Sequence, residues 1–216
     1  MPSLRVLNSG LVDYNEALSQ QLHWVSERKN QSLENIFWML SHPEVITLGA
    51  SRSSQDNLLI PTEIPVVKVS RGGDITYHDP GQLTGYFIFN LKDDQRDLHK
   101  FLWKIEEALI QCLQDFSIKA HRVTGKTGVF VNQKKVCSIG IACRHWVTYH
   151  GFSLNFNSNL DNYALMNPCG YSSNLMANVS NVEMQEFRKK IGSFIAGIFN
   201  LSYLGIEDWP ATTVSN

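Results

Sequence analysis

The sequence predicts a single α+β domain, residues 1–216, in which helices flank a mostly antiparallel sheet. Three observations lead to this fold class. Apolar residues recur at helical spacing over 12–28, 97–114 and 183–200. Short apolar runs of strand length fill the intervals between these segments, and no internal repeat or low-complexity linker divides the chain. The resulting order of helix, strands, helix, strands and helix is typical of a layered α+β structure.

The first half of the chain contains one predicted helix and four predicted strands. In the helix over 12–28, Tyr14, Leu18, Leu22 and Val25 share a face, and Asp13 stands near the start. The strands are expected at 34–40, 45–48, 66–69 and 84–91, and a His-Pro-Glu turn separates the first two.

The helix over 97–114 has the clearest pattern. Phe101, Ile105 and Leu109 fall on one face, and Asp97 is placed to cap the first turn. Strands are expected at about 121–124, 128–132, 136–143 and 146–157, followed by the helix over 183–200. The tail after Tyr203 carries no pattern, and no element is assigned to it.

Composition excludes several classes of function. The net charge is −1, whereas nucleic-acid-binding proteins and polybasic membrane-surface proteins usually carry an excess of Lys and Arg. No apolar run approaches the ~20 residues of a membrane span. The N-terminal residues lack the apolar block of a secretory signal. We therefore expect a cytoplasmic protein without membrane association, whose four cysteines are reduced.

One cysteine stands out as a candidate nucleophile. Cys112 lies on the apolar stripe of the 97–114 helix, and Cys137 lies on an apolar strand face, so both are expected to pack in the core. Cys143 lies at the end of the same strand, and the pattern does not decide whether it packs in the core. Cys169 lies in Asn-Pro-Cys-Gly-Tyr, a turn sequence that places a thiol near backbone N–H groups at the surface of a pocket. The alternative is a half-exposed loop thiol without a role.

Lys135 is the candidate partner for that thiol. Strand alternation predicts that Lys135 shares the apolar face of Cys137 and Ile139, whereas Lys134 points to the opposite face. An ammonium group on an apolar face is poorly solvated and exchanges its proton with a thiol more readily. The alternative is a lysine at a strand end that extends to water.

A glycine-rich segment, RGGDITYHDPGQLTGY from Arg71, is the candidate ligand loop. It matches neither a dinucleotide-binding nor a P-loop pattern, and an elaborate surface turn is the alternative. Cys143, His145 and His150 fit no usual zinc spacing, so no metal site is expected. His78 and His150 are better explained as hydrogen-bonding or proton-transfer groups.

Taken together, these motifs resemble the octanoyltransferases of lipoate biosynthesis. The resemblance runs nearly end to end and rests on several motifs in order: HPEVITLG at 42–49, RGGDITYHDPGQLTGY at 71–86, GKTGVFV at 125–131, KKVCSIGIA at 134–142, WVTYHGFSLN at 146–155 and NPCGY at 167–171. One departure is Asp79, where the family pattern usually has Gly before Pro-Gly-Gln. No catalytic residue is affected by it.

The resemblance implies a fold like that of the biotin and lipoate protein ligases. It implies that Cys169 is the nucleophile and that Lys135 tunes it. His150 is a candidate accessory residue on its own side-chain chemistry. The implied substrate-binding residues are Arg71, Gly72, Gly73, Asp74, Ile75, Thr76, Tyr77, His78, Ser138, Ile139, Gly140, Gly151, Phe152 and Ser153.

The resemblance also implies the partners. Octanoyl-acyl carrier protein would donate the acyl group. Lipoyl domains of 2-oxoacid dehydrogenases and the glycine cleavage H protein would accept it. No cofactor is required, and we expect a monomer. Three other functions remain open: an ATP-dependent lipoate ligase of the same fold, a cysteine hydrolase that uses His150, and a non-enzymatic acyl-binding module.

Overall fold

Two β-sheets and three long helices make up the described part of the chain in the computed structural model, residues 1–29, 34–51, 54–91, 96–167 and 175–210. The large sheet has the strand order β11 (Ser202–Asp208), β1 (Ser3–Leu11), β2 (Asn35–Ser41), β6 (Gln82–Ile88), β10 (Val147–Asn155), β9 (Lys134–Arg144), β8 (Lys126–Val131) and β7 (Ala120–Val123). The small sheet has the order β4 (Val66–Lys68), β3 (Val45–Leu48) and β5 (Ile75–His78).

Most strand pairs of the large sheet are antiparallel, and the small sheet has one pair of each kind. The exceptions are β1, which runs parallel to both β2 and β11, and the parallel pair β3 and β4. From β2 across to β7, every neighbouring pair in the large sheet is antiparallel. The predicted mostly antiparallel sheet is therefore confirmed.

The helices are α1 (Tyr14–Lys29), α2 (Leu98–Asp115) and α3 (Met184–Phe199), and their ends lie within two residues of the predicted ones. Local chemistry sets these ends. The Asp97 side chain accepts a hydrogen bond of 2.9 Å from the Lys100 N–H and so caps α2. Asn200 adopts the left-handed conformation, with φ of 55°, and ends α3.

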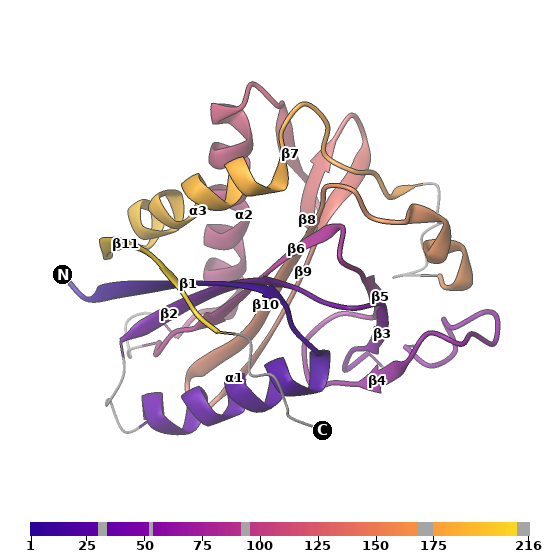
Figure 1. Cartoon of the computed structure of the whole chain (residues 1–216), viewed down its shortest axis with the longest axis horizontal. Helices are drawn as coiled ribbons and strands as arrows, with labels where there is room; N and C mark the ends of the chain where they lie inside the picture. Colours follow the sequence, from indigo (N-terminus) through magenta and orange to yellow (C-terminus); the bar gives the residue numbers. More distant parts are fainter. Residues whose placement is uncertain (30–33, 52–53, 92–95, 168–174, 211–216) are drawn as a thin grey trace.

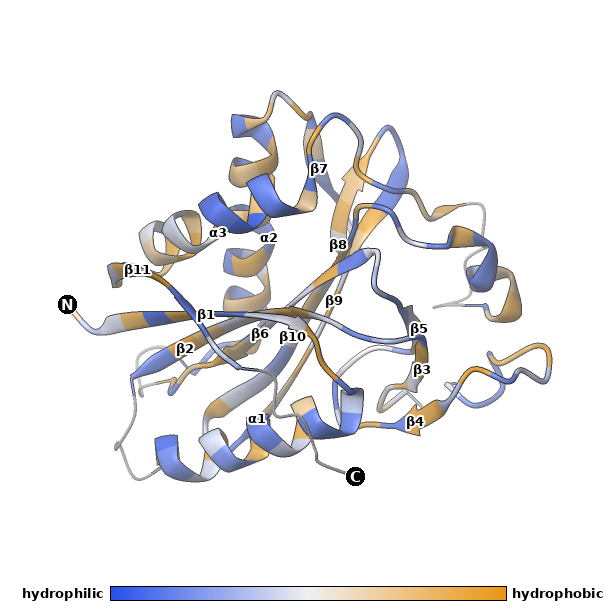
Figure 2. Ribbon diagram, in the orientation of Figure 1, coloured by the Kyte–Doolittle hydropathy of each residue, from blue (hydrophilic) through white to orange (hydrophobic). Residues whose placement is uncertain are grey.

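The helices cover opposite faces of the large sheet. Figure 1 shows α2 and α3 together on one side and α1 on the other. Phe101 and Leu109 of α2 and Phe187 of α3 join the core on the first side. Trp24 of α1 packs on Trp38 of β2 on the second. Hydrophilic and hydrophobic residues alternate along these helices in Figure 2, as expected for helices with one face on a core. None of the helices in the described ranges combines the length and apolar character that a membrane span requires.

The small sheet lies at the right of Figure 1, near the N-terminal end of α1, and adjoins the large sheet. The Gly72 N–H, in the segment before β5, donates a hydrogen bond of 2.8 Å to the Ile141 carbonyl of β9. The 3-10 helix η2 (Leu160–Leu165) packs on the small sheet through Tyr163, whose ring contacts Tyr77 edge-on. This junction leaves a cavity between the two sheets.

Three strands were not predicted. The structure adds β1 and β11 at the two ends of the chain, and it forms β5 within the glycine-rich segment that was expected to be a loop. Residues 75–78 are strand because each pairs with a residue of β3.

Candidate active site

A cavity at the junction of the two sheets collects most of the predicted site residues. Of these, Arg71, Gly73, Asp74, Ile75, Thr76, His78, Lys135, Ser138, Ile139, Gly140, His150, Gly151, Phe152 and Ser153 line it. Further lining residues are Tyr14, Thr84, Tyr86, Lys126, Phe130, Gln133, Leu175 and Met176. The lining residues from Arg71 to His78 come from β5 and from the segment between β4 and β5. Strands β8, β9 and β10 contribute most of the others.

Lys135 reaches this cavity from the beginning of β9 and is half-buried. Its backbone is held by the segment that returns after residue 174. Met176 forms a parallel bridge with Lys135, and the Ala177 N–H donates a hydrogen bond of 3.0 Å to the Lys135 carbonyl. The lysine and the chain that follows residue 174 are therefore direct neighbours.

The predicted alternation around Lys135 is wrong because β9 contains a bulge. Strand β8 pairs Phe130 with Lys135 but Val129 with Cys137, so one residue is extra on β9. As a result the consecutive residues Val136 and Cys137 both pack in the core beneath α2 and α3. Because of the extra residue, the two-residue alternation of a regular strand cannot be used to place Lys135 and Cys137 on the same face. Lys135 and Ile139 nevertheless both line the cavity.

Arg71 fixes the glycine-rich segment against both sheets. Its Nη2 donates to the carbonyl and to the hydroxyl of Thr47 in β3, at 3.0 and 2.8 Å. Gly140 of β9 allows this close approach, because a Cβ there would lie 2.6 Å from the Gly72 carbonyl oxygen. Gly140 thus lets the segment before β5 lie directly on β9.

Buried histidines and tyrosines form a polar part of the cavity lining. Burial, together with the positive charge of Arg71, lowers the pKa of His150 to about 3. Burial also lowers the pKa of His78 well below its ordinary value and raises the pKa of Tyr14 to about 12. These three groups are uncharged near neutral pH. Within the described part of the chain, both ring nitrogens of His150 are buried without a hydrogen-bond partner, and the residue lines the cavity.

Behind this lining lies His42, which is fully buried. One ring nitrogen, Nδ1, donates to the Val12 carbonyl at 2.7 Å, and Nε2 accepts from the Tyr86 hydroxyl at 2.7 Å. Burial lowers the pKa of His42 to about 4. The Tyr86 ring is therefore oriented from behind by a neutral imidazole.

Two predicted substrate-binding residues do not line the cavity. The Tyr77 side chain points into the small-sheet core, and its hydroxyl donates to Glu44 at 2.6 Å and accepts from Asn162 at 2.7 Å. Gly72 contributes its backbone to the contact with β9 instead. Asp79, the departure from the family pattern, is buried and accepts hydrogen bonds from Ser158 and the Asn159 N–H.

Of the cavity residues that the sequence argument did not single out, Thr84 and Tyr86 lie within the glycine-rich motif itself. Lys126 lies in GKTGVFV. Tyr14 carried no motif signal, because it comes from the first turn of α1 and reaches the site only through the packing of that helix.

Cys169 lies outside the described residues. The other three thiols are described, and burial raises the pKa of each: to about 12 for Cys112, and in the same direction for Cys137 and Cys143. Thiols of this kind stay protonated near neutral pH and are poor nucleophiles. Cys112 and Cys137 are buried in the core, as predicted, whereas Cys143 is half-buried at the end of β9.

Solved structures share this fold. A bipartite lipoate protein ligase from Thermoplasma acidophilum superposes with a TM-score of 0.74 at 15% identity, over 99% of this chain and 89% of the ligase chain. A lipoate-protein ligase A solved with ATP gives 0.71 at 15% identity, over 98% and 90%. A biotin acetyl coenzyme A carboxylase synthetase from Helicobacter pylori gives 0.51 at 13% identity, over 94% and 76%. The expected likeness to biotin and lipoate protein ligases is confirmed.

Sequence relatives identify the family. The family description that matches residues 13–202 is the lipoyl protein ligase A/B catalytic domain. An octanoyltransferase from Thermoanaerobacter sp. (strain X514) is 36% identical over 92% of this chain and 91% of its own. One from Geotalea uraniireducens is 39% identical over 91% and 94%. The chain therefore belongs to the lipoyl protein ligase A/B catalytic-domain family and, within it, to the octanoyltransferases.

Proposed function

We propose that this acyltransferase moves an octanoyl group from octanoyl-acyl carrier protein, through a thioester on Cys169, to a lysine of a lipoyl domain. The observation that carries the proposal is the position of Lys135 in the cavity wall, hydrogen-bonded through its backbone to the segment that follows Cys169 in the chain. Leu175 and Met176 of that segment line the same cavity.

The first step exchanges one thioester for another. Lys135 takes the proton of the Cys169 thiol, and the thiolate attacks the carbonyl carbon of the donor. The tetrahedral intermediate collapses by breaking the carbon–sulfur bond to the carrier, whose sulfur receives the proton held by Lys135. Backbone N–H groups of the strand from Lys135 to Gly140, or near Gly170, are the candidates to stabilise the oxyanion.

The second step forms the amide. The amine of the acceptor lysine attacks the enzyme thioester, Lys135 accepts its proton, and the Cys169 sulfur leaves. Since a thioester is already activated, neither ATP nor a metal ion enters this scheme. Apolar side chains of the cavity, including Ile139, Phe130 and Phe152, suit an alkyl chain.

The acceptors proposed are lipoyl domains of 2-oxoacid dehydrogenases and the glycine cleavage H protein, reached in the cytoplasm by a monomeric enzyme. The structurally similar archaeal ligase was solved as part of a lipoylation system with its E2 lipoyl domain, which supports this acceptor class. A cysteine hydrolase is disfavoured, because a histidine with the pKa of His150, about 3, is a weak base at neutral pH.

Intact-protein mass spectrometry tests the proposal. With octanoyl-carrier protein and no acceptor, the mass of the chain should rise by one octanoyl group, and it should return when a lipoyl domain is added. Cys169→Ala should abolish both changes. Cys137→Ala is the matched control: it should still be acylated, with a loss of stability of about 1 kcal/mol. Acylation of Cys169→Ala at the wild-type level would refute the proposed nucleophile.

A further inference from the structure

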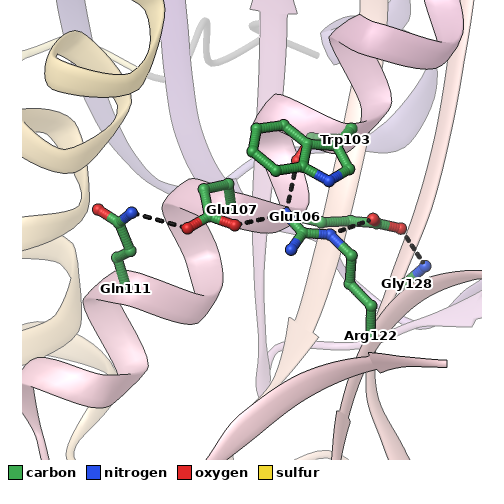
Figure 3. A network of polar contacts seen from close by, with 6 residues as sticks. All are labelled: Trp103, Glu106, Glu107, Gln111, Arg122 and Gly128. Carbon is green, nitrogen blue, oxygen red and sulfur yellow. Dashed lines mark hydrogen bonds and ion pairs between the residues drawn. The ribbon is translucent and has the colours of Figure 1, made fainter.

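A buried carboxylate on α2 connects that helix to the strand beside Lys135 (Figure 3). Glu106 is 8% exposed. Its Oε1 accepts a hydrogen bond of 2.9 Å from the Gly128 N–H of β8, and its Oε2 accepts one of 2.9 Å from Nε of Arg122 in β7. Both acceptor oxygens of the carboxylate are thus engaged. A buried carboxylate is costly unless such bonds are made, so its location calls for a reason.

Arg122 also forms an ion pair with a second carboxylate, that of Glu107. In Figure 3 the guanidinium lies between Glu106 and Glu107. It bonds Glu107 Oε2 at 2.8 Å and donates to the Trp103 carbonyl at 2.9 Å. Glu107 therefore shares the ion pair with Arg122, but among the hydrogen bonds of the described residues only Glu106 receives the Gly128 N–H.

Gly128 is in direct contact with Lys135. A Cβ at Gly128 would lie 2.7 Å from Cε and 3.3 Å from Nζ of Lys135, and 2.4 Å from the Cys137 carbonyl oxygen. The end of the lysine side chain therefore rests on the bare α-carbon of Gly128. The glycine has φ of +132°, a conformation that residues with a side chain rarely adopt. The bulge that displaces β9 against β8 lies next to this contact.

We propose that Glu106 is a positioning residue for Lys135. By holding the Gly128 N–H from the α2 side, the carboxylate fixes the backbone on which the lysine amine rests and thereby sets where that amine enters the cavity. The inference rests on the catalytic role proposed above for Lys135. A displacement of about 1 Å in a catalytic group costs on the order of a hundredfold in rate, so a support of this kind affects the chemical step.

Glu106→Gln and Glu107→Gln form a matched pair for the test. Glutamine has one acceptor oxygen, so at position 106 it serves either Gly128 or Arg122 but not both. We expect Glu106→Gln to lower kcat for octanoyl transfer at least tenfold, with KM for octanoyl-carrier protein within about twofold of wild type. Glu107→Gln leaves the bond to Gly128 intact and should keep kcat within about twofold.

The pH profile of kcat distinguishes positioning from stability. Displacement of the lysine amine should shift the limb of the profile that depends on Lys135 in Glu106→Gln, whereas a merely less stable enzyme keeps the wild-type profile with a lower folded fraction. Circular dichroism melting gives that fraction. Should Glu106→Gln fail to fold, Glu106→Asp keeps the charge for Arg122 but is too short to reach both donors, and the same kcat loss and pH shift are expected.

Lys135→Met separates failure of this inference from failure of the proposed function. Wild-type kcat in Lys135→Met would remove the catalytic role of the lysine, whatever Glu106 does. An inactive Lys135→Met together with folded Glu106→Gln and Glu106→Asp enzymes of wild-type kcat and pH profile would overturn the positioning role alone. An inactive Lys135→Met with the kcat loss and the pH shift confined to the position-106 variants supports both.

Discussion

At the scale of single residues, the role proposed for Lys135, which lines the cavity, leads to a prediction about the Cys169 thiol. We expect its ammonium to stabilise the Cys169 thiolate, so that the pKa of this thiol lies below the ordinary value of about 8.5. Iodoacetamide alkylation of Cys169, followed by peptide mass spectrometry as a function of pH, reports the thiolate fraction. The alkylation curve should move to higher pH in Lys135→Met.

The neighbouring lysine provides the control for this measurement. Lys134 is exposed at the beginning of the same strand, so Lys134→Met removes an equal charge from nearly the same place in the sequence. Its alkylation curve should overlay that of wild type. Overlapping curves for wild type and Lys135→Met would show that Lys135 does not tune the thiol.

A second residue-scale prediction concerns stability against pH. His42 is buried and neutral with a pKa of about 4, whereas a histidine in the unfolded chain titrates near 6.5. Between these values the unfolded state binds a proton that the folded state does not. The free energy of unfolding is therefore fully retained above about pH 6.5 and falls with decreasing pH to about 4, by roughly 1.4 kcal/mol per pH unit from this residue.

Urea denaturation at pH 7, 6 and 5 measures that slope. His42→Gln should show a shallower dependence on pH than wild type, whatever its absolute stability, because the titrating group is gone. His23→Gln, on the exposed surface of α1, should keep the wild-type slope. An unchanged slope in His42→Gln would contradict the assignment of this proton uptake to His42.

At the scale of elements, predictability followed the strength of the periodic signal. Helix α2 was predictable within one residue, because a buried apolar stripe repeats along it and Asp97 caps it. Strand β11 was not, because it is an edge strand with Leu204 77% exposed, and such a strand carries no apolar alternation. Strand β5 was hidden by its glycine-rich surroundings, and only pairing with β3 makes it a strand.

The bulge in β9 shows a further limit of sequence reasoning at this scale. Alternation assumes one residue per position, but Val136 and Cys137 both face the core. Nothing in KKVCSIG announces the extra residue, since it arises from the register between β8 and β9. Parity predicted that Lys135 shares the apolar face of Cys137 and Ile139, but the bulge interrupts the alternation between Lys135 and Cys137. The evidence for the position of Lys135 is therefore its place in the cavity lining.

At the scale of the whole molecule, the site is an assembly of segments that are distant in sequence. Motifs around Arg71, Lys135 and Gly151 were identifiable one by one, and the fold brings them to one junction between the sheets. Tyr14 was not identifiable as a site residue, because helix packing alone brings it to the cavity. The same fold occurs in a lipoate ligase solved with ATP, so architecture does not decide the energy source.

The source of activation, a thioester donor or ATP, must therefore be determined by assay. The sequence contains a candidate thiol nucleophile and no phosphate-cradling loop of the P-loop kind. We expect octanoyl-carrier protein and a lipoyl domain to give octanoylated domain in nucleotide-free buffer containing EDTA. Free octanoate with ATP and magnesium should give little or no product. A transferase begins from an activated thioester, whereas a ligase must first adenylate a free acid.

Four outcomes of this experiment correspond to four different functions. A strict requirement for ATP, with Cys169→Ala fully active, would identify a ligase. Rapid release of free octanoate in the absence of the lipoyl domain would identify a hydrolase, and an acyl chain held without covalent attachment would identify a binding module. Transfer without nucleotide that is lost in Cys169→Ala identifies the transferase, because among these four only that enzyme needs both the activated donor and the thiol.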